Sequence, residues 1–361
     1  MTEECQYQNQ LASDWMHRGI DLLNENSTDK LGQAIRCFDE AIALRRALPL
    51  ETEPFLRYGL SAGWINRGDA MTRLGDAAAL AGAVESYDAA LALLESLSLE
   101  DNILYPRRLA ITWINRGAAL QKQETANSLW EAVECFREAI AVLDHPSAAA
   151  VKDRISMQAG AWANLAAVFE YSSENTLEEA LAAARTALAM AKPMERTDAI
   201  AAETALRARH AFCRTAVKSM VEGRTLGSDL IAEAVNTVDE AMSVAAHWKL
   251  QGHANPERLA RDIFRLGCRI YERDKPHFLA EFLLKGLDPE QCGFSLDSEA
   301  LAAAQRAIWS ALDDLQVNGF RFVATPDFDS FMADVRRLRE VEERLQQLVA
   351  PPLASLGTTN H

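Results

Sequence analysis

The five residues WINRG occur twice in this chain, at 64–68 and again at 113–117. The tryptophans that begin the two copies are 49 residues apart. The same spacing leads back to Trp15, in WMHRG, and forward to Trp162, in WANLA. Four of the seven tryptophans therefore follow one period, which indicates an internal repeat.

A second motif recurs in step with the tryptophans. It reads AIRCFDEA at 34–41, AVESYDAA at 83–90, AVECFREA at 132–139 and, one residue early, ALAAARTA at 180–187. In the first three copies an alanine is followed by an aromatic residue four positions later, and by another alanine three positions after that. Residues spaced by three and four share one face of a helix. Each repeat is therefore predicted to be a hairpin of two helices.

Small and large residues take fixed places on these two helices. The small residues let two backbones approach closely; they are Gly19, Gly68, Gly117 and Ala166 on the first helices and Ala34, Ala83, Ala132 and Ala180 on the second. The large residues are expected to fill the space around them; they are Trp15, Trp64, Trp113, Trp162, Phe38, Tyr87 and Phe136. One hairpin cannot cover such an apolar face alone, so neighbouring hairpins are expected to stack.

This pattern resembles the tetratricopeptide repeat, written W-x2-L-G-x2-Y and then A-x3-F-x2-A. The fourth repeat is the most similar, with Trp162, Asn164, Leu165 and Ala166, and the resemblance covers residues 11–190 before weakening. The period of 49 exceeds the usual length of about 34 and predicts helices of about 20 residues, as in long-helix members of the family. The resemblance implies an all-α fold, a right-handed superhelical solenoid of antiparallel helix hairpins with C-terminal capping helices.

The expected organisation follows from the repeat. An N-terminal tail is predicted at 1–10, repeats over 11–250 (11–48, 54–97, 103–144, 150–191 and 197–248), a degenerate repeat with capping helices over 251–349, and a flexible tail at 350–361. The C-terminal helices are expected near 256–273, 276–286, 297–316 and 328–349. The last of these has abundant charge and one apolar stripe, so it is expected to cover the open end of the array.

Charge and composition bound the function classes. The chain has 52 acidic and 37 basic residues, and the resulting net charge of −15 disfavours a nucleic-acid partner and anionic membranes. The sequence has no apolar segment of the roughly 20 residues that a membrane-spanning helix needs, so membrane insertion is not expected. The start of the chain does not resemble a signal peptide, and the six cysteines form no CxxC pair, which together favour the cytoplasm.

No motif predicts catalysis. The chain lacks GxSxG, HExxH and GxxxxGK[ST], and its seven histidines are scattered without the spacing of metal ligands. The sequence therefore predicts a protein that is not an enzyme and that needs neither a cofactor nor a metal.

A row of arginines lies where the family normally places an apolar residue, three positions after the tryptophan. The row is Arg18, Arg67 and Arg116. Two interpretations remain open for it. In the first, these side chains form internal ion pairs with Asp14, Glu85 and Glu134; in the second, they line a groove for an anion or an acidic peptide. Three asparagines lie two positions after a repeat tryptophan and are expected to be hydrogen-bonded within the stack; they are Asn66, Asn115 and Asn164.

The resemblance also implies a groove for a partner. Its ligand-contacting positions correspond here to Met16, Ile65, Thr72, Arg73, Ile114, Gln121, Lys122, Glu170 and Tyr171. An apolar floor with a polar rim suits a peptide or helix of a partner protein. The expected function is a non-catalytic interaction scaffold. The alternatives are a regulatory subunit, gated by its C-terminal helices or by a small anionic ligand, and an enzyme without a recognisable motif.

Overall fold

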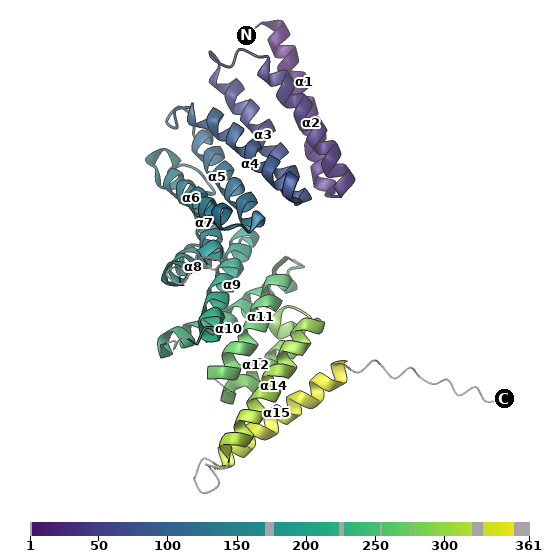
Figure 1. Cartoon of the computed structure of the whole chain (residues 1–361), viewed down its shortest axis with the longest axis vertical. Coiled ribbons are helices and arrows are strands. Elements are labelled where there is room, and N and C mark those ends of the chain that lie inside the picture. Colours follow the sequence, from purple (N-terminus) through teal and green to yellow (C-terminus); the bar gives the residue numbers. More distant parts are fainter. Residues whose placement is uncertain are drawn as a thin grey trace, which may run out of the picture. The chain divides into compact units, whose positions relative to one another are not determined.

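The computed structural model describes residues 2–169, 177–223, 227–252, 255–274, 276–319 and 328–349 of the chain. Within these residues the fold is all-helical, and successive helices pack on one another (Figure 1). The chain divides into two compact units, Met1–Met190 and Ala191–His361, which are described in turn. The flexible tail predicted at 350–361 lies outside the described residues.

Unit 1 is built from the predicted hairpins. The first helices are α1 (Glu3–Glu25), α3 (Pro54–Leu74), α5 (Leu104–Gln123) and α7 (Arg154–Phe169), and the second helices are α2 (Thr28–Arg46), α4 (Ala77–Glu95), α6 (Ala126–Asp144) and α8 (Leu177–Ala191). Helix α1 packs on α2, α3 on α4 and α5 on α6. Contacts of α2 with α3, of α4 with α5 and of α6 with α7 join each hairpin to the next. The predicted order is confirmed. Helices α1 to α6 have 19 to 23 residues, close to the predicted length, whereas α7 has 16 and α8 has 15.

The N-terminal tail predicted at 1–10 is wrong, because α1 already begins at Glu3. The Thr2 side chain accepts a hydrogen bond from the backbone N–H of Cys5 and so caps the helix. Glu3 and Glu4 follow in the first turn, where the helix dipole favours negative charge. Helix formation here needs no apolar stripe, which is why the repeat pattern did not reveal it.

Glycines of the first helices receive the aromatic rings of the second helices. A Cβ atom at Gly117 would lie 2.7 Å from Phe136 Cε1, and one at Gly68 would lie 2.7 Å from Tyr87 Cε1. Gly19 faces its own partner ring in the same way. The three rings are almost wholly buried. The predicted contact between small residues and aromatic rings therefore holds each hairpin together.

The tryptophans of the repeat do not fill the interior as expected. Trp15, Trp64, Trp113 and Trp162 are only partly buried. The first three pack against the edges of core clusters whose centres are alanine, leucine and the aromatic residues of the second helices. Part of each indole therefore stays at the surface.

A polar contact joins two hairpins inside unit 1. The Tyr87 hydroxyl donates a hydrogen bond to Asp69 Oδ1 at 2.6 Å, and Asn115 Nδ2 donates to the same oxygen at 2.9 Å. Asn115 lies on α5 and Asp69 on α3, so the amide connects successive first helices. The expected structural role of the repeat asparagine is confirmed at this position. Burial raises the pKa of Asp69, against the effect of these two donors.

Unit 2 contains one further hairpin and a C-terminal group of helices. These are α9 (Ala199–Val221), α10 (Ser228–Leu250), α11 (Asn255–Asp274), α12 (Pro276–Leu287), α13 (Pro289–Cys292), α14 (Ser298–Gly319) and α15 (Phe328–Val349). Helix α11 contacts α9, α10, α12 and α14. A Cβ atom at Gly267 of α11 would lie 2.7 Å from Phe282 of α12. The degenerate repeat therefore keeps the contact between glycine and an aromatic ring.

A buried arginine connects the elements of unit 2. Arg209 of α9 is 0% exposed, and it donates to Glu195 Oε2 at 2.6 Å and to Glu240 Oε2 at 3.0 Å. Trp248 Nε1 donates to the backbone oxygen of Glu195 at 2.7 Å. One guanidinium thus ties α9 to α10 and to the segment before α9, because a buried charge must be paired.

Helix α15 packs on α12 and α14 and buries Leu338, Val341 and Leu345.

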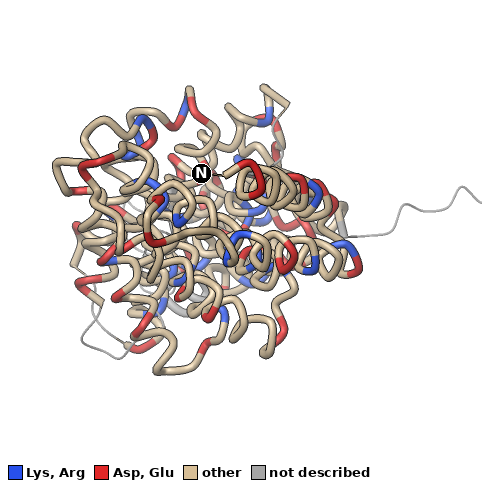
Figure 2. The backbone as a smooth tube through the Cα atoms, turned by 90° about the horizontal axis from the view of Figure 1, so that it is seen from above, with Lys and Arg blue, Asp and Glu red and all other residues tan. Residues whose placement is uncertain are grey.

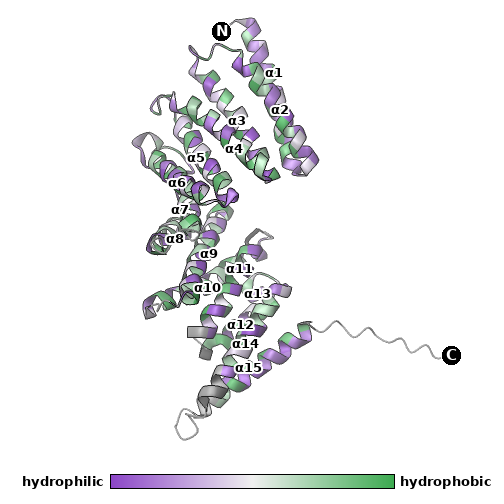
Figure 3. Ribbon diagram, in the orientation of Figure 1, coloured by the Kyte–Doolittle hydropathy of each residue, from purple (hydrophilic) through white to green (hydrophobic). Residues whose placement is uncertain are grey.

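Hydrophilic and hydrophobic residues share the helices of both units (Figure 3). Acidic and basic residues are interspersed along the described backbone (Figure 2). Helix α4 is long and apolar enough to cross a membrane by length and composition, but its Ala83, Tyr87 and Leu91 are buried in the core of unit 1.

Candidate functional site

Two residues of the predicted groove are part of the core instead. Met16 is 6% exposed and Ile65 is 7% exposed, so the prediction that they line an open groove is wrong. Met16 faces Gly63 of the next hairpin, which covers it. Ile114 and Gln121 are partly buried, and Glu170 and Tyr171 lie outside the described residues.

The polar groove positions connect hairpins. Arg73 Nη1 donates to the backbone oxygen of Leu23 at 2.9 Å, and Lys122 Nζ donates to that of Thr72 at 3.1 Å. Thr72 Oγ1 also lies 3.3 Å from the Tyr87 hydroxyl. Each cation thus binds a carbonyl near the C-terminal end of the preceding first helix, where positive charge is favoured. These contacts join each hairpin to the preceding one, although the Arg73 and Lys122 side chains are themselves exposed.

The arginine row forms ion pairs between hairpins. Arg67 Nε lies 2.8 Å from Asp39 Oδ1, and Arg116 Nε lies 2.7 Å from Asp88 Oδ1. The two aspartates belong to α2 and α4, the second helices of the preceding hairpins. Arg18 instead lies over the ring of Trp15, 5.5 Å from its centroid.

The internal interpretation of the arginine row therefore fits the structure, but the predicted partners Glu85 and Glu134 are wrong. Glu134 pairs with Arg137 on its own helix. Within its own hairpin, Arg116 donates to Cys135 Sγ at 3.1 Å. Burial lowers the pKa of Arg116, but the Asp88 carboxylate and Cys135 more than offset this, so its pKa is raised and the group stays cationic. For the neighbouring Cys135 thiol, burial raises the pKa.

A surface pocket of about 500 Å³ lies beside this ion pair. Its lining, which we call the tryptophan pocket, is Asp88 and Glu95 from α4, Trp113 and Arg116 from α5, and Trp130, Glu131, Glu134, Cys135 and Glu138 from α6. The α6 residues recur at intervals of three and four along the helix and so share one face. Three adjacent helices of unit 1 therefore build one site.

The tryptophan pocket combines aromatic surface with negative charge. Trp130 is 65% exposed, which is unusual for a residue of this size. The lining holds five carboxylates and one guanidinium. Arg116 neutralises Asp88 and part of Glu131, whereas Glu95 and Glu138 have no ion-pair partner among the described residues. Such a lining can bind a group that is both cationic and partly apolar.

The repeat pattern did not reveal this pocket, because its distinctive residues depart from the repeat. Trp130 corresponds to Ala81 one period earlier and to Gly32 two periods earlier. Glu138 corresponds to Ala89 and then to Glu40, so the indole is the clearer departure. A search for exceptions to the repeat, in place of its conserved positions, would have singled out α6.

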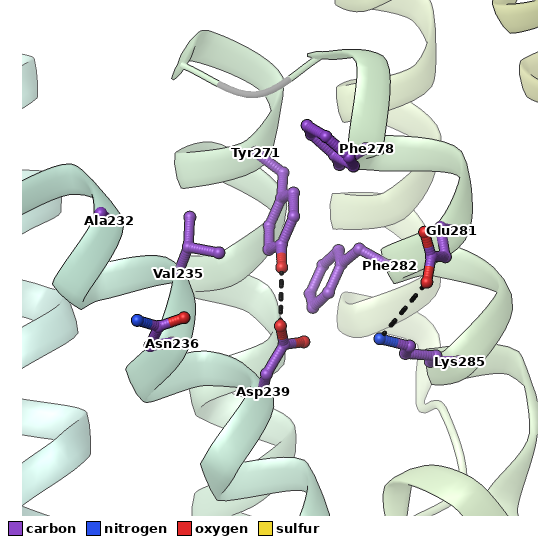
Figure 4. A pocket seen from close by; sticks show the side chains of 9 residues that line it. All are labelled: Ala232, Val235, Asn236, Asp239, Tyr271, Phe278, Glu281, Phe282 and Lys285. Atoms are coloured by element: carbon purple, nitrogen blue, oxygen red, sulfur yellow. Dashed lines mark hydrogen bonds and ion pairs between the residues drawn. The ribbon is translucent and has the colours of Figure 1, made fainter. Parts of the chain in front are cut away.

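A second pocket, of about 320 Å³, lies in unit 2 (Figure 4). Its lining is Ala232, Val235, Asn236 and Asp239 from α10, Tyr271 from α11, and Phe278, Glu281, Phe282 and Lys285 from α12. The Tyr271 hydroxyl donates to Asp239 Oδ2 at 3.2 Å, and the Tyr271 ring stacks on Phe282 with centroids 4.3 Å apart. Burial, together with the Asp239 carboxylate, raises the pKa of Tyr271, so the phenol stays neutral. The Tyr271–Asp239 hydrogen bond and the Glu281–Lys285 ion pair join polar groups of this pocket, whereas Asp239 Oδ1 is buried without a hydrogen-bond partner among the described residues.

The described part of the chain contains no group of three or more His, Cys, Asp or Glu residues that could hold a metal ion. All six cysteines are free thiols, and five of them are buried. The strongest pKa shifts arise from burial and from ion pairs between helices, which are structural causes.

Neither a model of a known protein family nor a curated protein sequence matches this chain. The resemblance to a repeat family therefore rests on the residue pattern alone.

Proposed function

We propose that unit 1 is a solenoid of the tetratricopeptide kind and that the chain is a non-catalytic scaffold, which binds a segment of a partner protein at the tryptophan pocket. The 49-residue period, the helical hairpins and their sequential packing support the first part. The second part moves the binding site away from the predicted groove, of which Met16 and Ile65 are buried and Arg73 and Lys122 contact the preceding hairpin.

The exposed Trp130 beside unpaired carboxylates is the observation that carries this proposal. Tryptophan is enriched among the residues that dominate binding energy in protein interfaces, because it buries a large area at small entropic cost. The flanking carboxylates select a basic segment and exclude an acidic one. A small anionic ligand suits this site less well, since the same carboxylates would repel it.

The test is selection of short random peptides displayed on phage against the full-length protein, followed by binding measurements on the selected peptides. We expect basic peptides, and we expect Trp130→Ala to weaken their binding by roughly tenfold or more, as for an interface hot spot. Trp309→Ala is the matched control, since Trp309 is 56% exposed on α14 in unit 2. Peptides that bind both variants as tightly as the unmodified protein would overturn the proposal, provided that circular dichroism shows both variants to be folded.

A further inference from the structure

The preceding repeat shows what a cation does at this place. The guanidinium of Arg46 lies over the ring of Trp64, 5.6 Å from its centroid, and that of Arg67 lies 5.8 Å from it. Arg46 is the last residue of α2 and reaches the first helix of the next hairpin. In this repeat, therefore, an arginine of the chain itself lies over the tryptophan ring.

One period later the covering arginine is missing. Trp113 takes the place of Trp64 and Arg116 that of Arg67, but Glu95 stands where Arg46 is expected. Arg116 is directed to Asp88 and Glu131, and among the described residues no cation lies over the Trp113 ring. A carboxylate has replaced the guanidinium that would complete the contact.

This replacement is unfavourable for the helix that carries it. Glu95 is the last residue of α4, which has no basic residue in its last turn. A carboxylate at a helix C-terminus is destabilising, because it lies next to unpaired carbonyls and the negative end of the helix dipole. Helices α1 and α6 also end on an acidic residue, Glu25 and Asp144, so Glu95 marks a site through the pocket around it and not through the helix end.

The neighbouring substitutions add to the same property. Relative to the preceding repeat, α6 has Trp130 in place of Ala81, Glu131 in place of Gly82 and Glu138 in place of Ala89. Relative to that repeat, the site therefore has a second indole and further negative charge, in an open surface depression of about 500 Å³.

We propose that the tryptophan pocket binds an arginine side chain of the partner protein. The guanidinium of this arginine lies over the Trp113 ring, as that of Arg46 lies over the Trp64 ring. This inference rests on the proposed function and specifies the partner. The planar guanidinium stacks on the indole of Trp113 and donates hydrogen bonds to Glu95 and Glu138. A lysine ammonium is a compact, strongly hydrated charge that stacks less well and gives up more hydration on entering such a site.

The first experiment compares ligands that differ at one side chain. The probes are three versions of one short glycine- and serine-rich peptide with a single central arginine, lysine or citrulline, and binding to the full-length protein is followed by titration. We expect the arginine peptide to bind roughly tenfold more tightly than the lysine peptide, and the uncharged citrulline peptide to bind least. Equal affinity for the arginine and lysine peptides would overturn the inference, and the proposed docking function would then rest on the Trp130 test alone.

The second experiment restores the internal arginine. Glu95→Arg places a guanidinium where Arg46 stands in the preceding repeat and so occupies the site from within. We expect this variant to melt at a higher temperature, because the helix end is improved, and yet to bind the arginine peptide at least roughly tenfold more weakly. Glu85→Arg is the matched control, since Glu85 is exposed on the same helix outside the pocket and the change of charge is identical. Equal weakening by both variants would show general charge attraction and would overturn the inference.

Discussion

Equivalent positions in successive repeats differ in ways that follow from hydrogen bonding. Tyr87 occupies the place that Phe136 takes in the next repeat and Phe38 in the preceding one. Of these three buried rings, only Tyr87 carries a hydroxyl. Asp69 accepts from that hydroxyl, whereas the residue equivalent to Asp69 beside Phe136 is Ala118. A buried donor and its acceptor therefore occur together or not at all, as the cost of an unsatisfied buried group requires.

Tyr87→Phe is expected to destabilise the protein by about 1–3 kcal/mol, because Asp69 loses a buried hydrogen bond. The double variant Tyr87→Phe with Asp69→Ala should recover part of this loss, since it restores the pair found in the next repeat. Recovery stays incomplete because Asn115 then lacks its acceptor. Urea denaturation of the single and double variants gives the coupling energy, and strictly additive effects would contradict the pairing.

The partly buried His210 is expected to make the stability of unit 2 depend on pH. Burial lowers the pKa of His210 to about 4, and the nearby Arg214 acts in the same direction. Between pH 6.5 and pH 4, His210 is protonated in the unfolded chain but stays neutral in the folded protein. The free energy of unfolding therefore falls as the pH falls through this range, by up to about 3 kcal/mol from this group.

His210→Gln removes that contribution and serves as the reference. We expect the difference in unfolding free energy between the unmodified protein and His210→Gln to shrink, or to change sign, as the pH is lowered from 7 to about 4.5. Chemical denaturation at several pH values measures it. A difference that is independent of pH would show that His210 titrates normally in the folded protein.

At the scale of helices, the repeat predicted most of the fold. The hairpin order and the helix lengths followed from alternating tryptophan and alanine motifs, because the glycine and aromatic positions that hold a hairpin together lie within one repeat. The partners of Arg67 and Arg116 were misplaced for the complementary reason. Their aspartates lie on the preceding hairpin, and the facing helix cannot be read from the pattern of a single hairpin.

The candidate site shows the same limit. Trp130 and Glu138 lie on one face of α6, which the sequence shows, but their approach to Glu95 depends on how α4, α5 and α6 pack. The predicted groove positions were drawn from shorter repeats. Here Met16 and Ile65 are covered by the neighbouring hairpin, so family positions transfer poorly when helices lengthen.

Two glycines in unit 1 test the packing of these helices. Gly117→Ala is expected to destabilise by about 1–3 kcal/mol, because the new Cβ would lie 2.7 Å from the Phe136 ring. Gly160→Ala in α7 should stabilise by up to about 1 kcal/mol, since nothing lies within 4 Å and alanine favours the helix. Thermal and urea denaturation compare the two. Similar effects of both substitutions would contradict the contact between Gly117 and Phe136.

At the scale of the molecule, the division into two units predicts separate stabilities. Each hairpin of unit 1 packs chiefly on its neighbours in the chain, and unit 2 has its own core around α11. In such arrays stability is a sum of repeat and neighbour terms, so a local defect need not spread through the whole chain.

Arg209→Met is the variant that tests this independence. It leaves Glu195 buried without its partner, and we expect unit 2 to lose about 3–5 kcal/mol of stability. Hydrogen exchange resolved by mass spectrometry should show reduced protection in α9, α10 and α11 and unchanged protection in α3 to α6. Arg67→Met gives the converse comparison in unit 1, with a smaller loss because its partner Asp39 is half exposed. Loss of protection throughout the chain after either substitution would show that the two units unfold as one.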